Sequence, residues 1–165
     1  MVRLRYYINV VINRNYNRIT KEEEFIVQNV GETPSSPVPI KMEVGIEECL
    51  HIEFEFEKNS FHLKDCIVGK VSFNLVRIKI KMMELSIIRK ETVGANQSAV
   101  TEQETLSKFE IMDGAPVKGE LVPVRFYLAS TDLTPTYENV NNRFSCRYSI
   151  NLVLIDEQDR RYFKQ

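Results

Sequence analysis

The chain is dominated by segments in which apolar and polar residues alternate, and helical periodicity is scarce. The clearest segment runs from Phe144 to Ile155, where apolar residues occupy every second position as far as Leu154. Successive side chains of a strand point to opposite faces, so this pattern predicts a strand with one buried face and a register fixed by burial. A second clear case is 50–57, in which apolar residues alternate with His51 and with glutamates.

The same alternation recurs along the chain at hairpin-like spacing, and the alternating segments are rich in β-branched and aromatic residues. Turn signals rich in Gly, Pro, Asn and Asp separate them. The tract Thr134–Val140 is compatible with a single helical turn. Many short strands separated by such turns indicate an all-β fold, either a sandwich or a barrel. We predict strands over residues 4–12, 24–30, 40–46, 50–57, 66–76, 78–90, 106–110, 121–128 and 144–155.

Composition places the chain among ordinary globular proteins of one domain. It has 165 residues, 43% hydrophobic and 27% charged, with a formal net charge of −1, so no global field favours nucleic acid or an anionic membrane. Three cysteines without C-x-x-C spacing favour free thiols in a reducing compartment. No apolar run approaches the roughly 20 residues of a membrane span, and the start has no signal-peptide core. We expect a cytoplasmic protein that is soluble or peripheral to a membrane.

Candidate catalytic groups are few. The two histidines, His51 and His62, lie in no hydrolase or metalloprotease motif. Glu53, Glu55 and Glu57 share one face of a predicted strand, which is the pattern of a solvated surface rather than of a glycosidase pair. We therefore expect no enzyme activity and assign no catalytic residue.

One constellation has the residue types of a zinc site. Cys49, His51, His62 and Cys66 would come together if a hairpin joined the two pairs. Their C-x-H and H-x-x-x-C spacing matches no standard finger or ribbon, and Cys66 begins an apolar run in which cysteine behaves as a small buried hydrophobe. We expect no metal and no cofactor, and keep a zinc site as an alternative.

A basic stretch offers a second alternative. Arg77, Lys79 and Lys81 alternate with apolar residues, which would place three cations on one face of a strand. Such a face suits the phosphates of nucleic acid or lipid, and a nucleic-acid-binding β-barrel is the alternative function. No aromatic residue interleaves the cations for base stacking, so a solvated face that blocks edge pairing is favoured.

The segment around Ile111 and Met112 is unusual because two apolar residues stand directly beside the turn signal Asp113-Gly114. Turns normally take polar residues, and exposed apolar side chains at a loop tip indicate a protein interface. Burial of both residues under the turn as ordinary core fits the spacing equally well.

Three long strings carry a family resemblance. They are IKMEVGIEECLHIEF at 40–54, FEIMDGAPVKGE at 109–120 and NLVLIDEQDRRYFKQ at 151–165. All three closely resemble the arrestin-like subunit of the endosomal retromer coat, the vacuolar protein sorting 26 family. Similarity extends through 61–93 and 122–148, so it covers most of the chain.

The resemblance implies an arrestin-type, immunoglobulin-like β-sandwich, the second of two in the family. Residues 1–12 resemble the strand that leads out of the first sandwich, and 13–165 resemble the second. The chain enters a predicted strand almost at its first residue and stops without a closing turn. Both features are expected of a piece of a longer protein.

The resemblance also implies a non-catalytic role in endosomal sorting and retrograde transport, with only peripheral membrane association, through the coat. In the family, the second sandwich docks on a helical-solenoid scaffold subunit through a loop that matches Ile111, Met112, Asp113 and Gly114. Cargo sorting signals bind with a sorting nexin between the two sandwiches, where an extended segment adds along a strand edge. The matching positions are Val44 and Phe163.

Overall fold

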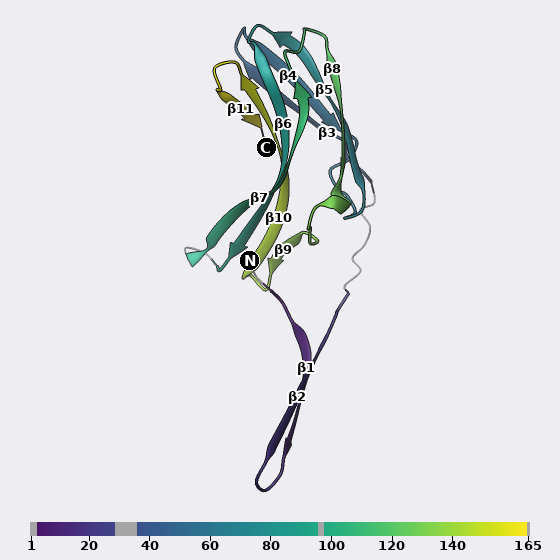
Figure 1. Ribbon diagram of the computed structural model, residues 1–165, viewed down its shortest axis with the longest axis vertical. Helices are drawn as coiled ribbons and strands as arrows, with labels where there is room; N and C mark the ends of the chain where they lie inside the picture. Colours follow the sequence, from purple (N-terminus) through teal and green to yellow (C-terminus); the bar gives the residue numbers. More distant parts are fainter. Residues whose placement is uncertain (1–2, 29–35, 96–97, 165) are drawn as a thin grey trace. The chain divides into compact units, whose positions relative to one another are not determined.

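The computed structural model describes residues 3–28, 36–95 and 98–164 and consists almost entirely of strands (Figure 1). It divides into two compact units, Met1–Ser35 and Ser36–Gln165. In the first unit, β1 (Tyr6–Asn13) and β2 (Arg18–Phe25) form a two-stranded antiparallel ribbon. All eight residues of each strand are exposed, so this ribbon has no core of its own.

The second unit contains two antiparallel sheets. One has four strands in the order β3-β4-β5-β8, and the other has the order β11-β10-β6-β7 with β9 also paired to β10. A short 3-10 helix, η2 (Leu128–Ser130), follows β8. The strands are β3 (Ile40–Ile46), β4 (Leu50–Phe56), β5 (Cys66–Val76), β6 (Ile80–Val93), β7 (Val100–Asp113), β8 (Leu121–Tyr127), β9 (Tyr137–Val140), β10 (Phe144–Asp156) and β11 (Arg161–Lys164).

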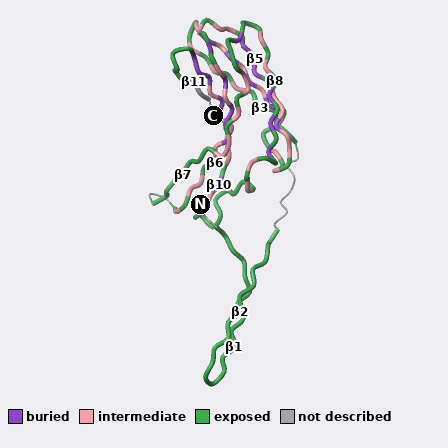
Figure 2. The backbone as a smooth tube through the Cα atoms, in the orientation of Figure 1, coloured by how far each residue is buried: buried purple, intermediate pink, exposed green. Residues whose placement is uncertain are grey.

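The core lies between the two sheets and is built by the alternation seen in the sequence. Along β4 every second residue is buried, and Ile52 is 0% exposed. Phe73 of β5 lies in the same cluster, with Leu85 of β6 and Leu154 of β10 from the other sheet. Figure 2 shows the buried residues concentrated in these facing strands. The predicted all-β sandwich is therefore confirmed.

Both β9 and β11 pair with β10, at opposite ends of that strand. β9 pairs at Phe144 and Cys146, whereas β11 pairs at Leu152–Ile155. Because β6 pairs with β10 from Phe144 to Asp156, β9 and β11 share its other edge. β11 is therefore a short edge strand with β10 as its partner.

Several predicted boundaries are wrong. The second strand was expected at 24–30 but lies at 18–25, because its charged residues pair with β1 in a ribbon that buries neither face; residues 29 and 30 fall outside the described residues. β7 begins at Val100 rather than at 106, because the long β6 supplies pairing partners along its whole length. Within Thr134–Val140 there is no helical turn among these described residues, since Tyr137–Val140 is strand β9.

Candidate functional site

Their sequence context indicated a loop tip for Ile111 and Met112. In the structure, both lie in the last residues of β7. Met112 stands opposite Met83, which is 0% exposed, and the register shifts at the next pair, so Ile111 is the extra residue of a bulge. Both side chains are half-buried and pack against the core. The two alternatives for this pair are therefore combined: part of each side chain is core, and part remains exposed.

The turn after β7 is exposed and is held by backbone hydrogen bonds. Asp113 and Gly114 are exposed, and the Gly114 N–H donates to the Lys81 carbonyl at 2.8 Å. Gly114 has φ of 107°, a left-handed conformation in which a side chain is strained although a Cβ would meet no atom within 4 Å. Further on, the Gly119 N–H donates to the Phe73 carbonyl at 2.7 Å, which ties the loop to β5. The turn thus presents an exposed carboxylate beside partly exposed apolar side chains.

Val44 and Phe163 lie on the edge strands of the two sheets. Val44 is in β3, opposite Ile52, and is half-buried against the core. Phe163 is in β11, opposite Val153, and its side chain is outside what the structure describes. β7 and β8 contact each other at one side of the sandwich, so β3 and β11, at the other ends of the two sheet orders, lie at the opposite side. Both candidate residues therefore belong to one side of the sandwich.

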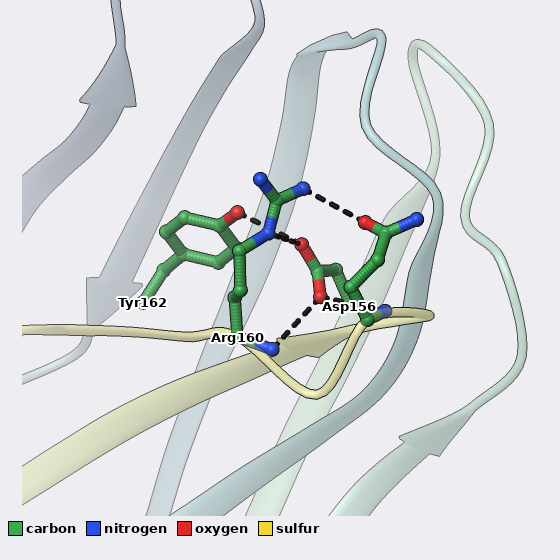
Figure 3. Close-up of polar contacts among 4 residues, drawn as sticks. Asp156, Arg160 and Tyr162 are labelled. Atoms are coloured by element: carbon green, nitrogen blue, oxygen red, sulfur yellow. Dashed lines mark hydrogen bonds and ion pairs between the residues drawn. The ribbon is translucent and has the colours of Figure 1, made fainter.

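A buried carboxylate closes the turn between β10 and β11 (Figure 3). Asp156 is 0% exposed, and its Oδ1 accepts the N–H groups of Gln158 and Arg160, each at 2.9 Å. Its Oδ2 accepts Arg160 Nε at 2.7 Å and the Tyr162 hydroxyl at 2.9 Å. Both oxygens are thereby saturated with donors from the turn and from β11, as a buried carboxylate requires.

The pKa shifts of Asp156 and Tyr162 agree with these hydrogen bonds. Burial acts to raise the pKa of Asp156, but the hydrogen bonds from Arg160 and Tyr162 outweigh it and the net pKa is lowered. Burial, together with the bond to Asp156, raises the pKa of Tyr162. Cys49, in the turn between β3 and β4, lies close enough to Tyr162 to raise that pKa further. Tyr162 therefore links the buried Asp156 carboxylate to the core against which its ring packs.

Sequence reasoning missed the Asp156 cluster. An aspartate after an apolar strand, followed by polar residues, normally indicates an exposed turn. The available signal was the return of an aromatic residue, Tyr162, directly after that turn. It shows that the chain goes back to the core, although it does not show that the carboxylate is buried.

The four residues of the alternative zinc site, Cys49, His51, His62 and Cys66, do not come together in the structure. His51 stands opposite Leu75, near the end of β5, whereas Cys66 is the first residue of β5. Leu75 and Cys66 are nine positions apart along β5, which corresponds to roughly 30 Å at about 3.3 Å per residue. His62 lies in the loop before Cys66, where its Nδ1 accepts the Lys64 N–H at 3.2 Å. The two halves of the proposed site therefore lie at opposite ends of the hairpin.

Among the described residues, one other group has metal-ligating atoms within 4.8 Å of one another, namely Glu43, His51 and Glu53 on the outer face of β3 and β4. His51 Nε2 lies 3.5 Å from a Glu43 carboxylate oxygen, and Lys41 Nζ lies 3.3 Å from one of Glu53. Ion pairing across the two strands accounts for this arrangement.

The predicted basic face on a single strand is not observed. Arg77 and Lys79 lie in the connection between β5 and β6, and Lys81 lies in β6, so the three cations do not share a strand. Lys79 Nζ is 3.6 Å from a Glu157 carboxylate oxygen, and Lys81 Nζ is 3.3 Å from one of Asp159. The observation that motivated a nucleic-acid-binding barrel is therefore absent. In the described part of the chain, no helix is long and apolar enough to cross a membrane.

A solved structure shares the fold. The crystal structure of Spo0M, a sporulation control protein from Bacillus subtilis, superposes with a TM-score of 0.50 at 14% sequence identity. The match covers 68% of this chain and 45% of that chain. At this identity the similarity concerns the β fold alone.

Curated relatives are much closer in sequence. The chain is 58% identical over 165 residues to vacuolar protein sorting-associated protein 26 of Plasmodium falciparum, covering 99% of this chain and 56% of that protein. It is 55% identical over 164 residues to protein 26B of Danio rerio and 54% identical over 164 residues to human protein 26B, covering 99% of this chain and 50% and 49% of those proteins. The chain thus spans about half the length of the curated relatives it matches.

The family model described as vacuolar protein sorting-associated protein 26 matches residues 1–159. This match takes in both units of the structure and every strand from β1 to β10. With relatives more than half identical over almost the whole chain, the chain belongs to the vacuolar protein sorting-associated protein 26 (Vps26) family, and its antiparallel sandwich is of the arrestin type.

Proposed function

We propose that this chain is part of a non-catalytic retromer coat subunit that acts in endosomal protein sorting and retrograde transport. The observation that carries the proposal is 58% identity over 99% of the chain to a vacuolar protein sorting-associated protein. The subunit would act on the cytoplasmic side of the endosome, attached to the membrane only through the coat.

Strand pairing supports a revised domain assignment, which we propose here. We expected residues 1–12 to lead out of a first sandwich and 13–165 to form the second. β1 pairs with β2 along all eight positions, and the two compact units divide between Ser35 and Ser36. We therefore propose that the whole ribbon belongs to the first sandwich and that the second sandwich begins at Ser36.

The scaffold contact is proposed at the turn formed by Ile111, Met112, Asp113 and Gly114. Its partner would be the N-terminal end of the helical-solenoid subunit, whose grooves between helices suit a short apolar pair with a polar rim. Exposure of Asp113 and Gly114 and the half-burial of the two apolar residues support this assignment.

Because Ile111 and Met112 are half-buried, the proposed scaffold contact is better tested at an exposed residue of the turn. Charges at Ile111 or Met112 would disturb the core as well as the surface, whereas Asp113 is exposed. We expect Asp113→Arg to lower affinity for the scaffold subunit at least about tenfold, a loss of about 1.4 kcal/mol, in a titration by calorimetry. The melting temperature should stay within about 2 °C because exposed substitutions rarely affect folding.

The matched control is Asp132→Arg, the same change of charge at an exposed position after η2. It should leave scaffold affinity at the wild-type value. Equal affinities for Asp113→Arg, Asp132→Arg and the wild type would reject the turn as the docking site.

The cargo site is proposed along the β3 and β11 edges, with Val44 and Phe163 as the residues that meet an apolar side chain of the cargo. A sorting nexin and the first sandwich would complete the groove. Edge strands have unpaired backbone groups, and these can accept an extended peptide. Val44→Ala and Phe163→Ala should each weaken binding of a cargo-tail peptide to the subunit with both sandwiches, without changing scaffold affinity.

A further inference from the structure

The β11 edge strand has little backbone pairing. It is four residues long and pairs with β10 between Leu152 and Ile155. The preceding turn passes through Asp159 at φ of 60°, a left-handed conformation that is unfavourable for a residue with a side chain. Short edge strands of this kind fray readily unless something outside the ladder holds them.

The Asp156 carboxylate supplies that additional restraint. Four hydrogen bonds run to it from Gln158, Arg160 and Tyr162, so every second residue from the turn into β11 is tied to one buried group. Backbone bonds close the same turn, since the Asp156 N–H donates to the Arg160 carbonyl at 3.1 Å and the Asp159 N–H to the Asp156 carbonyl at 3.0 Å. Figure 3 shows the side chains of Arg160 and Tyr162 converging on Asp156.

Tyr162 connects this restraint to the core between the two sheets. It stands opposite Leu154, which is 0% exposed, and packs against the core. Val44 lies in β3 and also packs against the core. The tyrosine held by Asp156 directly precedes Phe163 in β11, the edge strand that lies at the same side of the sandwich as β3.

We propose that Asp156 is a positioning residue of the cargo groove. Through Arg160 and Tyr162, Asp156 holds β11 in register and so fixes the position of Phe163 relative to Val44. The inference rests on the proposed cargo site and names the group that keeps its β11 side preformed. A preformed strand edge lowers the ordering cost of β-augmentation, so its loss should weaken peptide binding without removing any direct contact.

Two variants test the proposal. Tyr162→Phe removes a single hydroxyl and keeps the ring packed, and Asp156→Asn keeps the shape but loses the charge. The probe is a fluorescein-labelled cargo-tail peptide with leucine at its anchoring position, titrated against the subunit that carries both sandwiches together with the sorting nexin. We expect about fivefold to tenfold weaker binding for each variant and about tenfold faster hydrogen exchange at residues 161–164.

The matched control is Asp159→Asn in the same turn. Asp159 is exposed and pairs with Lys81 at 3.3 Å, and asparagine tolerates its positive φ. This control should change neither peptide binding nor exchange in β11. Scaffold affinity should stay at the wild-type value in all three variants, which shows that each remains folded.

The outcomes separate this inference from the proposed cargo site. If Val44→Ala and Phe163→Ala weaken peptide binding but Tyr162→Phe does not, the groove stands and the role of Asp156 is only structural. If Val44→Ala and Phe163→Ala bind the peptide as the wild type does, the groove itself is wrong. Should Asp156→Asn fail to fold, Tyr162→Phe alone decides, because the ring that contacts the core is unchanged.

Discussion

At the scale of single residues, Gly69 shows how closely the sheet and its core are fitted. It stands opposite Phe56 in the β4–β5 pair, and a Cβ there would overlap both the Glu55 carbonyl oxygen and the Phe56 ring. Neither group can move freely, since one is backbone and the other is a ring that is 4% exposed. Only glycine fits at this position.

We predict that Gly69→Ala lowers the free energy of unfolding by about 2 kcal/mol, because a methyl group in this space displaces the strand or the ring. Urea denaturation of the chain measures the change. Ser72→Ala on the same strand is the control and should stay within about 0.5 kcal/mol of the wild type. A Gly69→Ala protein as stable as Ser72→Ala would show that the two strands can separate at little cost.

A second prediction concerns the pH dependence of Asp156. Its pKa is lowered from the ordinary value of 3.8, so folding favours the ionised form and the folded protein is stabilised above that value. As pH falls below about 4 and through the lowered pKa, the carboxylate is protonated and this contribution is lost. The difference in unfolding free energy between the wild type and Asp156→Asn should therefore shrink from pH 7 to pH 3.

Comparison with the variant is needed because Glu55 and Asp65 also have lowered pKa values, through hydrogen bonds to Lys70 and Lys58 respectively. Their contributions are present in both proteins and cancel in the difference. A difference that stays constant between pH 7 and pH 3 would mean that the charge of Asp156 does not stabilise the fold.

At the scale of elements, the sequence predicted strands that bury one face more closely than the exposed β2 and the exposed start of β7, although it also predicted the exposed β1. β4 alternates buried and half-buried residues along its whole length, and its periodicity alone placed it correctly. The first six residues of β7 are all exposed, so no alternation marks them. Arg89 of β6 is 7% exposed and donates a hydrogen bond to Glu104 of β7, a cross-strand contact that sequence patterns do not reveal.

The candidate site was predictable to a similar degree. Val44 and Phe163 were chosen by resemblance, and strand order explains why two residues so far apart in the chain lie at one side of the sandwich. The state of Ile111 and Met112 was not predictable, because a bulge decides which side chains turn inward at the end of β7. Register shifts of this kind depend on the partner strand rather than on local sequence.

At the scale of the whole molecule, the two units differ in what stabilises them. The residues of the hydrophobic core cluster all come from the second unit. The ribbon of the first unit leaves Tyr6, Ile8 and Phe25 exposed, although Tyr6 and Phe25 contact each other across the strands. A two-stranded ribbon without a covering layer is marginally stable in water, and this one buries neither face.

We therefore predict that the 36–165 chain folds alone. Without residues 1–35 it should keep its melting temperature within about 2 °C of the full 165-residue chain, because the core is complete without them. In the full chain, amides of β1 and β2 should exchange in seconds, while those of β4 and β5 require global unfolding. A melting temperature lowered by 10 °C or more on deletion, or slow exchange in β1, would show that the ribbon belongs energetically to the second sandwich and would move the domain boundary back toward residue 12.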